Sequence, residues 1–427
     1  MKRLLKRAAG TFGLRISYTF LTFVTSVVLA RLLGKAGFGT YTYVVSWAYL
    51  LAIPATLGFE GLVGREISIY QAKLSWSHIS GLLRWANILT IFSSLAIATT
   101  AAAIAFSSAD GGDPHLLLCF LLVMLALPMM ALRNIRRGSM RGLDRIVLGL
   151  FPEMLVAPAL ILVLVALSAV WLQDDFTASW AVGIYVLATG VTLALSMTQL
   201  ERILPFNVQT ALPRYARIDW LTRALPFMFL ESVNVINARA DLLMLGQLNG
   251  VEATGIYVPV NRGAQLIVFV LMAFSGPLSP TIASLYATGK QQELQQLLLK
   301  AARVCLLVSA IATTALLIFG RQYLLVFGPG FDTGLEALRV LCIGKVLYVF
   351  VGLAPMVLSM TGHARLTAIT GLVSVLINIA LNLVLIPRYG VTGAAIATTC
   401  GLMASGVVNT IWAYKKVGLH FNLLSQG

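Results

Sequence analysis

The sequence has few charged residues for its length. Asp, Glu, Lys and Arg make up 11% of the 427 residues, and hydrophobic residues make up 59%. A soluble globular chain has about 25% charged residues. A chain so poor in charge cannot cover the surface of a set of soluble domains, so a soluble class of protein is excluded.

Motifs for nucleotide, metal and disulfide chemistry are also lacking. No GxxxxGK[ST] loop occurs, and the four histidines are scattered without the spacing of metal ligands. The four cysteines fall in apolar stretches and are interpreted as packing residues: Cys119, Cys305, Cys342 and Cys400. We therefore expect no cofactor, no metal and no enzyme activity, and any transport would run on an ion gradient or on the gradient of the substrate.

Long apolar stretches recur from one end of the chain to the other. A helix needs about 20 mostly apolar residues to cross a hydrocarbon core of about 30 Å. About twelve such spans are predicted, at residues 12–33, 38–63, 82–107, 115–132, 146–171, 179–200, 221–247, 254–283, 302–319, 335–360, 366–387 and 390–413. The predicted fold class is an all-α membrane protein.

The loops between these spans alternate in charge. One set is basic and includes Lys2, Arg3, Lys6 and Arg7, then Lys73 and Arg84, then a predicted basic turn with Arg133, Arg136, Arg137, Arg141 and Arg145. The other set is acidic, with Asp110, Asp113, Asp174, Asp175 and Glu252. Basic loops stay in the cytoplasm, so both termini are predicted to be cytoplasmic. The net charge of +15 is spread over many loops and does not indicate nucleic-acid binding.

The two halves of the chain are related by short matches. Leu32, Gly34, Gly39 and Tyr41 correspond, at one constant spacing, to Leu248, Gly250, Gly255 and Tyr257. Six spans per half give a parallel repeat. We expect two pseudo-symmetric six-helix lobes around a central cavity, with an N-terminal lobe at 1–205, a cytoplasmic connector at 206–219 and a C-terminal lobe at 220–427.

The seventh predicted span carries polar residues on one face. Glu231, Asn234, Ala238 and Asp241 follow steps of three, four and three residues. Arg239 flanks this stripe, and the eighth span adds Asn261, Arg262 and Gln265. A polar face on a membrane helix favours a wet groove. The alternative is a packing cluster in which Arg239 or Arg262 pairs with Asp241.

Other polar groups within spans have two interpretations each. Glu60 and Lys345 are candidate cavity residues, and Arg31 is another, although it lies near a span end where snorkelling is the default. Glu153 lies between two prolines and either carries a proton or pairs with an arginine. In the eleventh span, interhelical hydrogen bonds are the favoured role of Thr370, Ser374, Asn378 and Asn382.

Several segments resemble a known family. They are 29–34, 37–41 and 57–66 in the first half, and 241–246, 254–257 with Arg262, and 387–398 in the second half. Together they resemble the polysaccharide flippases of the O-antigen and exopolysaccharide type, within the multidrug/oligosaccharidyl-lipid/polysaccharide exporter superfamily. The resemblance covers nearly the whole chain, and its glycine and packing patterns specify the fold better than the substrate.

This resemblance implies an alternating-access transporter of a bacterial inner membrane. The implied substrate is an undecaprenyl-diphosphate-linked sugar unit, moved from the cytoplasmic to the periplasmic leaflet. Because no ATP-binding motif is present, H⁺ or Na⁺ is the expected coupling ion, with Glu153 and Asp241 as the candidate coupling residues. The implied partners are membrane lipid and polysaccharide polymerase or assembly proteins. Arg31, Arg239, Arg262 and Lys345 match the cationic cavity of the family by position, and Asp241 matches an acid of its seventh span.

Two other functions remain as alternatives. A cation-coupled multidrug exporter of the same fold would need fewer arginines and more acidic and aromatic groups in its cavity. A membrane-embedded polysaccharide polymerase or ligase would need a large periplasmic loop with paired catalytic groups, and the outer loops here are too short for that.

Overall fold

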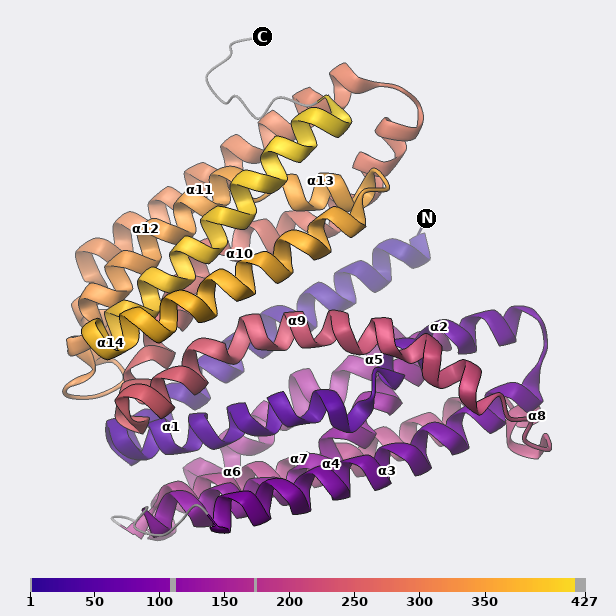
Figure 1. Cartoon of the computed structure of the whole chain (residues 1–427), viewed down its shortest axis with the longest axis horizontal. Coiled ribbons are helices and arrows are strands. Elements are labelled where there is room, and N and C mark those ends of the chain that lie inside the picture. Colours follow the sequence, from indigo (N-terminus) through magenta and orange to yellow (C-terminus); the bar gives the residue numbers. More distant parts are fainter. Residues whose placement is uncertain (1, 108–112, 173–174, 419–427) are drawn as a thin grey trace. The chain divides into compact units, whose positions relative to one another are not determined.

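The structure is a computed structural model that describes residues 2–107, 113–172 and 175–418 (Figure 1). Within these ranges every regular element is a helix. Two of the acids in the predicted outer loops, Asp110 and Asp174, lie outside the described residues. The all-α fold class predicted from the sequence is confirmed for the described part of the chain.

The helices of the first half follow one another with short connections. They are α1 (Lys2–Thr56), α2 (Phe59–Ala72), α3 (Trp76–Ser107), α4 (Pro114–Gly142), α5 (Ile146–Phe151), the π-helix η1 (Pro152–Val156), α6 (Ala157–Leu172), α7 (Ala178–Ile203), α8 (Phe206–Thr210) and α9 (Arg217–Asn249). The second half has α10 (Val251–Ala287), α11 (Gln291–Leu325), the 3-10 helix η3 (Phe331–Gly334), α12 (Leu335–Val351), α13 (Ala354–Met360) and α14 (Ala364–Val417).

The number of membrane crossings agrees with the prediction of about twelve. Nine helical segments of the described chain are long and apolar enough to cross a membrane. Two of them, of 47 and 54 residues, have a non-helical residue inside, at Gly34 and Gly390, and each is long enough to cross twice. The 33 residues of α9 are less apolar because of their charged side chains, but they are long enough for a further crossing. The nine segments, the second crossing of each bent helix and the crossing by α9 make twelve.

The glycines of the internal repeat lie at matching bends. Gly34 bends α1 with φ 65° and ψ −174°, and Gly250 separates α9 from α10 with φ 85° and ψ 160°. Both conformations have positive φ and extended ψ, a region that only glycine adopts without strain. A glycine with the same kind of backbone conformation thus lies between the first two spans of each half, which agrees with the predicted duplication.

The chain forms two compact units, Met1–Arg239 and Ala240–Gly427. The division lies inside α9, because the first turns of this helix belong to the core of the first unit. There Trp220 and Ala224 pack with Phe59 and Leu62 of α2. The domain boundaries predicted at 205 and 220 stay a prediction.

Helix α4 is the centre of the first unit, where it contacts α1, α2, α3 and α7. Its glycines allow α2 to approach closely. A Cβ on Gly138 would stand 2.4 Å from the Glu60 carbonyl oxygen, and one on Gly142 would stand 2.8 Å from the carbonyl oxygen of Gly64. This backbone contact brings the first turn of α2 against the last turns of α4.

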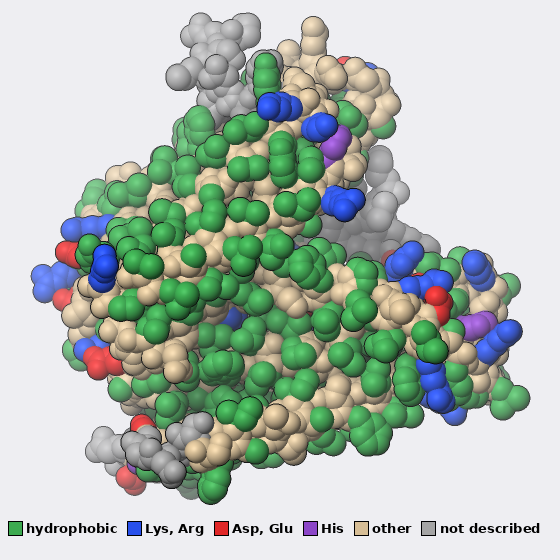
Figure 2. Space-filling model, in the orientation of Figure 1, with side chains coloured by type: hydrophobic (Ala, Val, Ile, Leu, Met, Phe, Trp, Pro, Cys, Tyr) green, Lys and Arg blue, Asp and Glu red, His purple; other side chains and the backbone are tan. Residues whose placement is uncertain are grey.

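Large apolar side chains on the helix flanks are exposed, as expected for a surface that faces lipid. Phe92 is 70% exposed on α3, and Leu125 is 60% exposed on α4. Figure 2 shows hydrophobic side chains over these flanks, and Lys and Arg side chains gathered at the end where α2, α3 and α8 lie. Bands of this kind fit a helical protein embedded in a bilayer.

The close contact of α2 with α4 gives a first prediction. Gly138→Ala places a methyl group against the backbone carbonyl of Glu60. Because this backbone cannot move without shifting α2, the substitution should destabilise the protein by about 1–3 kcal/mol. Gly183→Ala is the matched control, because a Cβ there meets nothing within 4 Å. Thermal unfolding of the purified variants in detergent measures the difference. Equal stability of the two variants would contradict the close α2–α4 contact.

Candidate functional site

The first unit contains a cavity of about 690 Å³. Side chains from α1, α2, α4, η1 and α9 line it. Its charged lining residues are Glu60, Arg65, Arg137, Arg141, Glu153, Glu231 and Arg239, and its polar ones include Tyr49, Asn134 and Asn234. Four arginines against three glutamates give the lining a formal charge of +1, so the cavity is slightly cationic.

Arg137 of α4 is the centre of the charged network in this cavity. Its Nε donates to Glu60 Oε1 at 2.9 Å, and its Nη2 donates to Glu60 Oε2 at 2.7 Å. Its Nη1 donates to Oε2 of Glu153 on η1. A planar guanidinium matches a carboxylate in this two-pronged geometry, which is the strong form of the ion pair. One cation therefore joins α2, α4 and η1.

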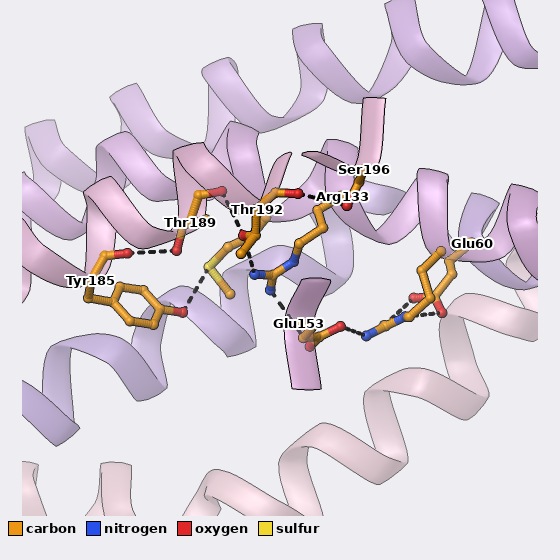
Figure 3. Close-up of polar contacts among 9 residues, drawn as sticks. Glu60, Arg133, Glu153, Tyr185, Thr189, Thr192 and Ser196 are labelled. Atoms are coloured by element: carbon orange, nitrogen blue, oxygen red, sulfur yellow. Dashed lines mark hydrogen bonds and ion pairs between the residues drawn. The ribbon is translucent and has the colours of Figure 1, made fainter. Parts of the chain in front are cut away.

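Arg133, one turn before Arg137, extends the network away from the cavity. It is 5% exposed, its Nη2 lies 3.7 Å from Glu153 Oε1, and its Nη1 donates to the hydroxyl of Thr192 at 3.4 Å. Thr192 in turn donates to the Thr189 carbonyl on α7 (Figure 3). A buried charge is tolerated when it is paired and hydrogen-bonded, and this pairing supplies both.

The predicted basic turn at Arg133–Arg145 is wrong for most of its length. Helix α4 continues to Gly142, so four of the five arginines are helical, and Arg133 and Arg136 are buried. Hydropathy alone ended the span at residue 132, because it counts a paired arginine as if it were a solvated one. The carboxylates that pair with Arg133 and Arg137 come from distant parts of the sequence.

A π-helical turn places Glu153 in the cavity. Pro152 and Pro158 lack backbone N–H groups, and the Ala157 N–H donates to the carbonyl oxygen of Pro152, five residues back. Such a widened turn relieves the clash that a proline causes in a regular helix, and it is frequent at functional sites. Of the two roles left open for Glu153, pairing with an arginine is observed.

The polar face predicted on the seventh span is divided between two places. Glu231, Asn234 and Ala238 line the cavity of the first unit, as does Arg239. The guanidinium of Arg239 lies 4.5 Å from the centre of the Tyr49 ring, a cation–π contact. The structure thus brings Glu60, Glu153 and these residues of α9 to one cavity, and their role in binding stays a prediction.

Asp241 lies in the second unit, in a cluster of neutral hydrogen-bond donors. Its Oδ1 accepts from Asn378 Nδ2 at 2.9 Å and Asn382 Nδ2 at 2.8 Å. Its Oδ2 accepts from the hydroxyls of Tyr257 at 2.8 Å and Thr398 at 2.5 Å. The expected interhelical role of Asn378 and Asn382 is confirmed, and Arg239, the suggested partner of Asp241, contacts Tyr49 instead.

The remaining predicted residues do not line the cavity of the first unit. Arg31 is exposed on α1, three residues before the bend at Gly34. On α10, Asn261 and Arg262 are half-buried and Gln265 is exposed, and Lys345 is half-buried on α12. Their part in binding stays a prediction.

The sequence interpretation missed Arg65, Arg137, Arg141, Tyr49 and Asn134, all of which line the cavity. One signal was available. Arg133, Arg137 and Arg141 are spaced by four residues, which places them on one face if the fourth span continues as a helix. No comparable pattern marks the other three.

Two family models match the chain. The model described as polysaccharide biosynthesis protein matches residues 4–286, and the model described as MatE matches residues 226–384. The probable flippase AglR of Haloferax volcanii is 24% identical over 421 residues, which cover 96% of this chain and 83% of that protein. The probable low-salt glycan biosynthesis flippase Agl15 of the same organism is 22% identical over 429 residues, which cover 98% and 84%.

Solved structures of transporters share the fold. An inward-facing multidrug resistance MATE family transporter of the MOP superfamily superposes with a TM-score of 0.75 at 14% identity, covering 96% of this chain and 98% of that one. A MOP superfamily transporter from Pyrococcus furiosus gives 0.66 at 14% identity, covering 99% and 96%. The structures establish a transporter fold, and the family match over residues 4–286 exceeds half of the chain. The chain is therefore a multi-pass membrane protein that belongs to the polysaccharide biosynthesis protein family.

Proposed function

We propose that this protein moves an undecaprenyl-diphosphate-linked oligosaccharide across a bacterial inner membrane by ion-coupled alternating access. The observation that carries the proposal is the charged cavity of the first unit, lined by Arg65, Arg137, Arg141 and Arg239 within a mostly apolar helix bundle. The flippase names of the two Haloferax relatives support transport of a lipid-linked glycan.

The charge of the head group explains why a flippase needs such a cavity. A single charge at the centre of a bilayer costs at least about 3 kcal/mol, and a diphosphate carries more than one. Arginine lowers this cost because its weakly hydrated fork binds two phosphate oxygens at once. The polyprenyl tail has no such cost and stays in the hydrocarbon while the head group passes through the cavity.

The position of the cavity suits loading from the cytoplasmic leaflet. Arg137 and Arg141 lie in the last turns of α4, just before the connection at residues 143–145, and Arg65 lies on α2. The neighbouring connections carry Lys73 and Arg145. By the positive-inside rule this end of the bundle is cytoplasmic, as are both termini.

The glutamates of the lining serve release. A purely cationic cavity would hold a diphosphate too firmly for turnover, because conduction through a site needs binding that can be reversed. Glu60, Glu153 and Glu231 lower the net charge of the lining to +1. Tyr49 and the asparagines Asn134 and Asn234 offer a ring face and amide groups to the sugars.

The coupling ion is proposed to bind at Asp241. Four side chains surround this buried carboxylate: Tyr257 and Thr398 with their hydroxyls, and Asn378 and Asn382 with their amide groups. Asn382 Oδ1 is buried and accepts no hydrogen bond from any described residue. A proton would bind the carboxylate directly, and Na⁺ would favour amide groups turned to present their oxygens, as hard cations prefer oxygen ligands.

The other residues expected from the sequence complete the proposal. Arg31, Arg262 and Lys345 would receive the anionic head group later on its path, and Asn261 with Gln265 would contact sugar. Polysaccharide polymerase and assembly proteins would act on the exported unit. These roles rest on the family resemblance, on the positive charge of Arg31, Arg262 and Lys345, and on the amide groups of Asn261 and Gln265.

A multidrug exporter is the second candidate, and the MatE match to residues 226–384 favours it. The cavity argues against this candidate, since four arginines in its lining repel the cationic compounds that such an exporter would carry. Transport of an anionic lipid-linked sugar in the absence of transport of cationic dyes would separate the two.

Substitution of the cavity arginines tests the proposal. Arg141→Ala and Arg239→Ala should each lower transport about tenfold or more, since each removes hydrogen bonds to a charged group worth about 1.5–3 kcal/mol. Lysine at either position should restore part of the activity, because it keeps the charge without the fork. Surface polysaccharide, measured at equal amounts of membrane protein, gives the readout.

The control for these variants is Arg321→Ala. Arg321 is 68% exposed, pairs with Asp332 at 3.4 Å and is not a lining residue of the cavity. It should keep wild-type activity. Full activity of both cavity variants would remove Arg141 and Arg239 from the transport path.

The coupling site gives a separate prediction. Asp241→Asn removes the charge that attracts the ion but keeps the size of the side chain. Uptake driven by a Na⁺ or pH gradient in proteoliposomes should be abolished, while Asp219→Asn, at a carboxylate that is 51% exposed, should leave the response unchanged. A normal gradient response of Asp241→Asn would show that coupling lies elsewhere.

A further inference from the structure

Each of the three nitrogen atoms of the Arg137 guanidinium already donates to a carboxylate. Nε and Nη2 bind Glu60, and Nη1 binds Glu153. A phosphate that binds two of these nitrogens in the two-pronged geometry must therefore displace one of the carboxylates. Which of them leaves depends on the edge of the guanidinium that each one occupies and on what else holds it.

The two carboxylates are held differently. Glu153 has a second cation, since Arg133 Nη2 lies 3.7 Å from its Oε1 on the side away from the cavity. Among the described residues, the ion pair of Glu60 is with Arg137 alone. Loss of Arg137 would leave Glu153 still paired and Glu60 without a cation. A displaced Glu60 is thus left without a cation and is driven back to Arg137, whereas a displaced Glu153 would keep Arg133. Glu60 is also the carboxylate that occupies two N–H groups on one edge of the guanidinium, the pair that a phosphate needs, so a phosphate that binds this edge displaces Glu60.

The backbone around Glu60 fits this role. Glu60 stands in the first turn of α2, directly after a break where Leu57 and Gly58 have φ of 49° and 74°. Its side chain is 16% exposed and lines the cavity, so a released carboxylate meets water. Arg141 lies close to Glu60, because its Nη2 already donates to the Glu60 backbone carbonyl oxygen at 3.2 Å.

We propose that Glu60 is an internal competitor of the substrate: the diphosphate displaces its carboxylate from Arg137, and return of the carboxylate to Arg137 promotes release. The inference rests on the proposed function, because it needs a diphosphate ester in this cavity. No covalent bond forms or breaks. One anion replaces another on the same guanidinium, so the charge on the Arg137 fork stays compensated throughout the exchange.

A purely structural role of the network is the rival explanation, since Arg137 ties α2, α4 and η1 together. The two roles predict opposite effects of Glu60→Gln on anion binding. A competitor that is removed leaves Arg137 with a free edge, and binding becomes tighter. A structural tie that is removed loosens the site, and binding stays equal or becomes weaker.

The experiment measures binding of inorganic pyrophosphate to the purified full-length protein by calorimetry. Glu60→Gln should bind pyrophosphate about tenfold or more tightly than the wild type, the change expected when a charge-assisted hydrogen-bonded competitor is removed. Glu153→Gln is the matched control. It should give a smaller gain, because Glu60 still holds Arg137 with both oxygens. The double variant Glu60→Gln/Arg137→Gln should lose the gain.

Thermal unfolding of each variant reports whether it is folded. Glu60→Gln should remain folded, because Arg137 keeps Glu153. Binding by the wild type, with equal or weaker binding by folded Glu60→Gln, overturns the competitor role and leaves the proposed function standing. Absence of pyrophosphate binding in the wild type and in Glu60→Gln alike contradicts both.

Discussion

The pairing of Arg137 with Glu60 and Glu153 is the interaction on which the rest of the first unit depends. A guanidinium within a bundle of apolar helices is tolerated only when charge and hydrogen bonds compensate it. Compensation here needs two carboxylates from two other elements, so α2 and η1 must both lie against α4. Glycines at 138 and 142 allow the first contact, and the π-helical turn at 152–156 provides the second. The same groups give the cavity its charge, so packing and chemistry share one set of residues.

Hydropathy and glycine patterns predicted the fold well because they are local. The spans differ from the helices mainly at their ends, and Gly34 and Gly250 have the conformations that a repeated bend requires. Helical periodicity found Glu231 and Asn234, which line the cavity. Arg137 was missed for a physical reason. An arginine looks like a loop residue until its partners are known, and Glu60 and Glu153 are 77 and 16 residues away in the chain.

The two units hold opposite kinds of polar site. The first has a cavity with four arginines and three glutamates, suited to an anion that binds and leaves. The second has one buried carboxylate surrounded by amides and hydroxyls, and no described arginine or lysine is bonded to it. A carboxylate whose hydrogen bonds all come from neutral donors is suited to a small cation. This separation supports the proposed mechanism, in which the diphosphate first binds in the cavity of the first unit and the coupling ion binds in the second unit.

The most direct test of the account is an experimental structure with an undecaprenyl-diphosphate-linked sugar bound. The account predicts that the diphosphate lies in the cavity of the first unit, in contact with Arg137 and Arg141, and that the Glu60 carboxylate has left Arg137. A diphosphate bound away from these arginines, with the Glu60–Arg137 pair intact, would contradict it.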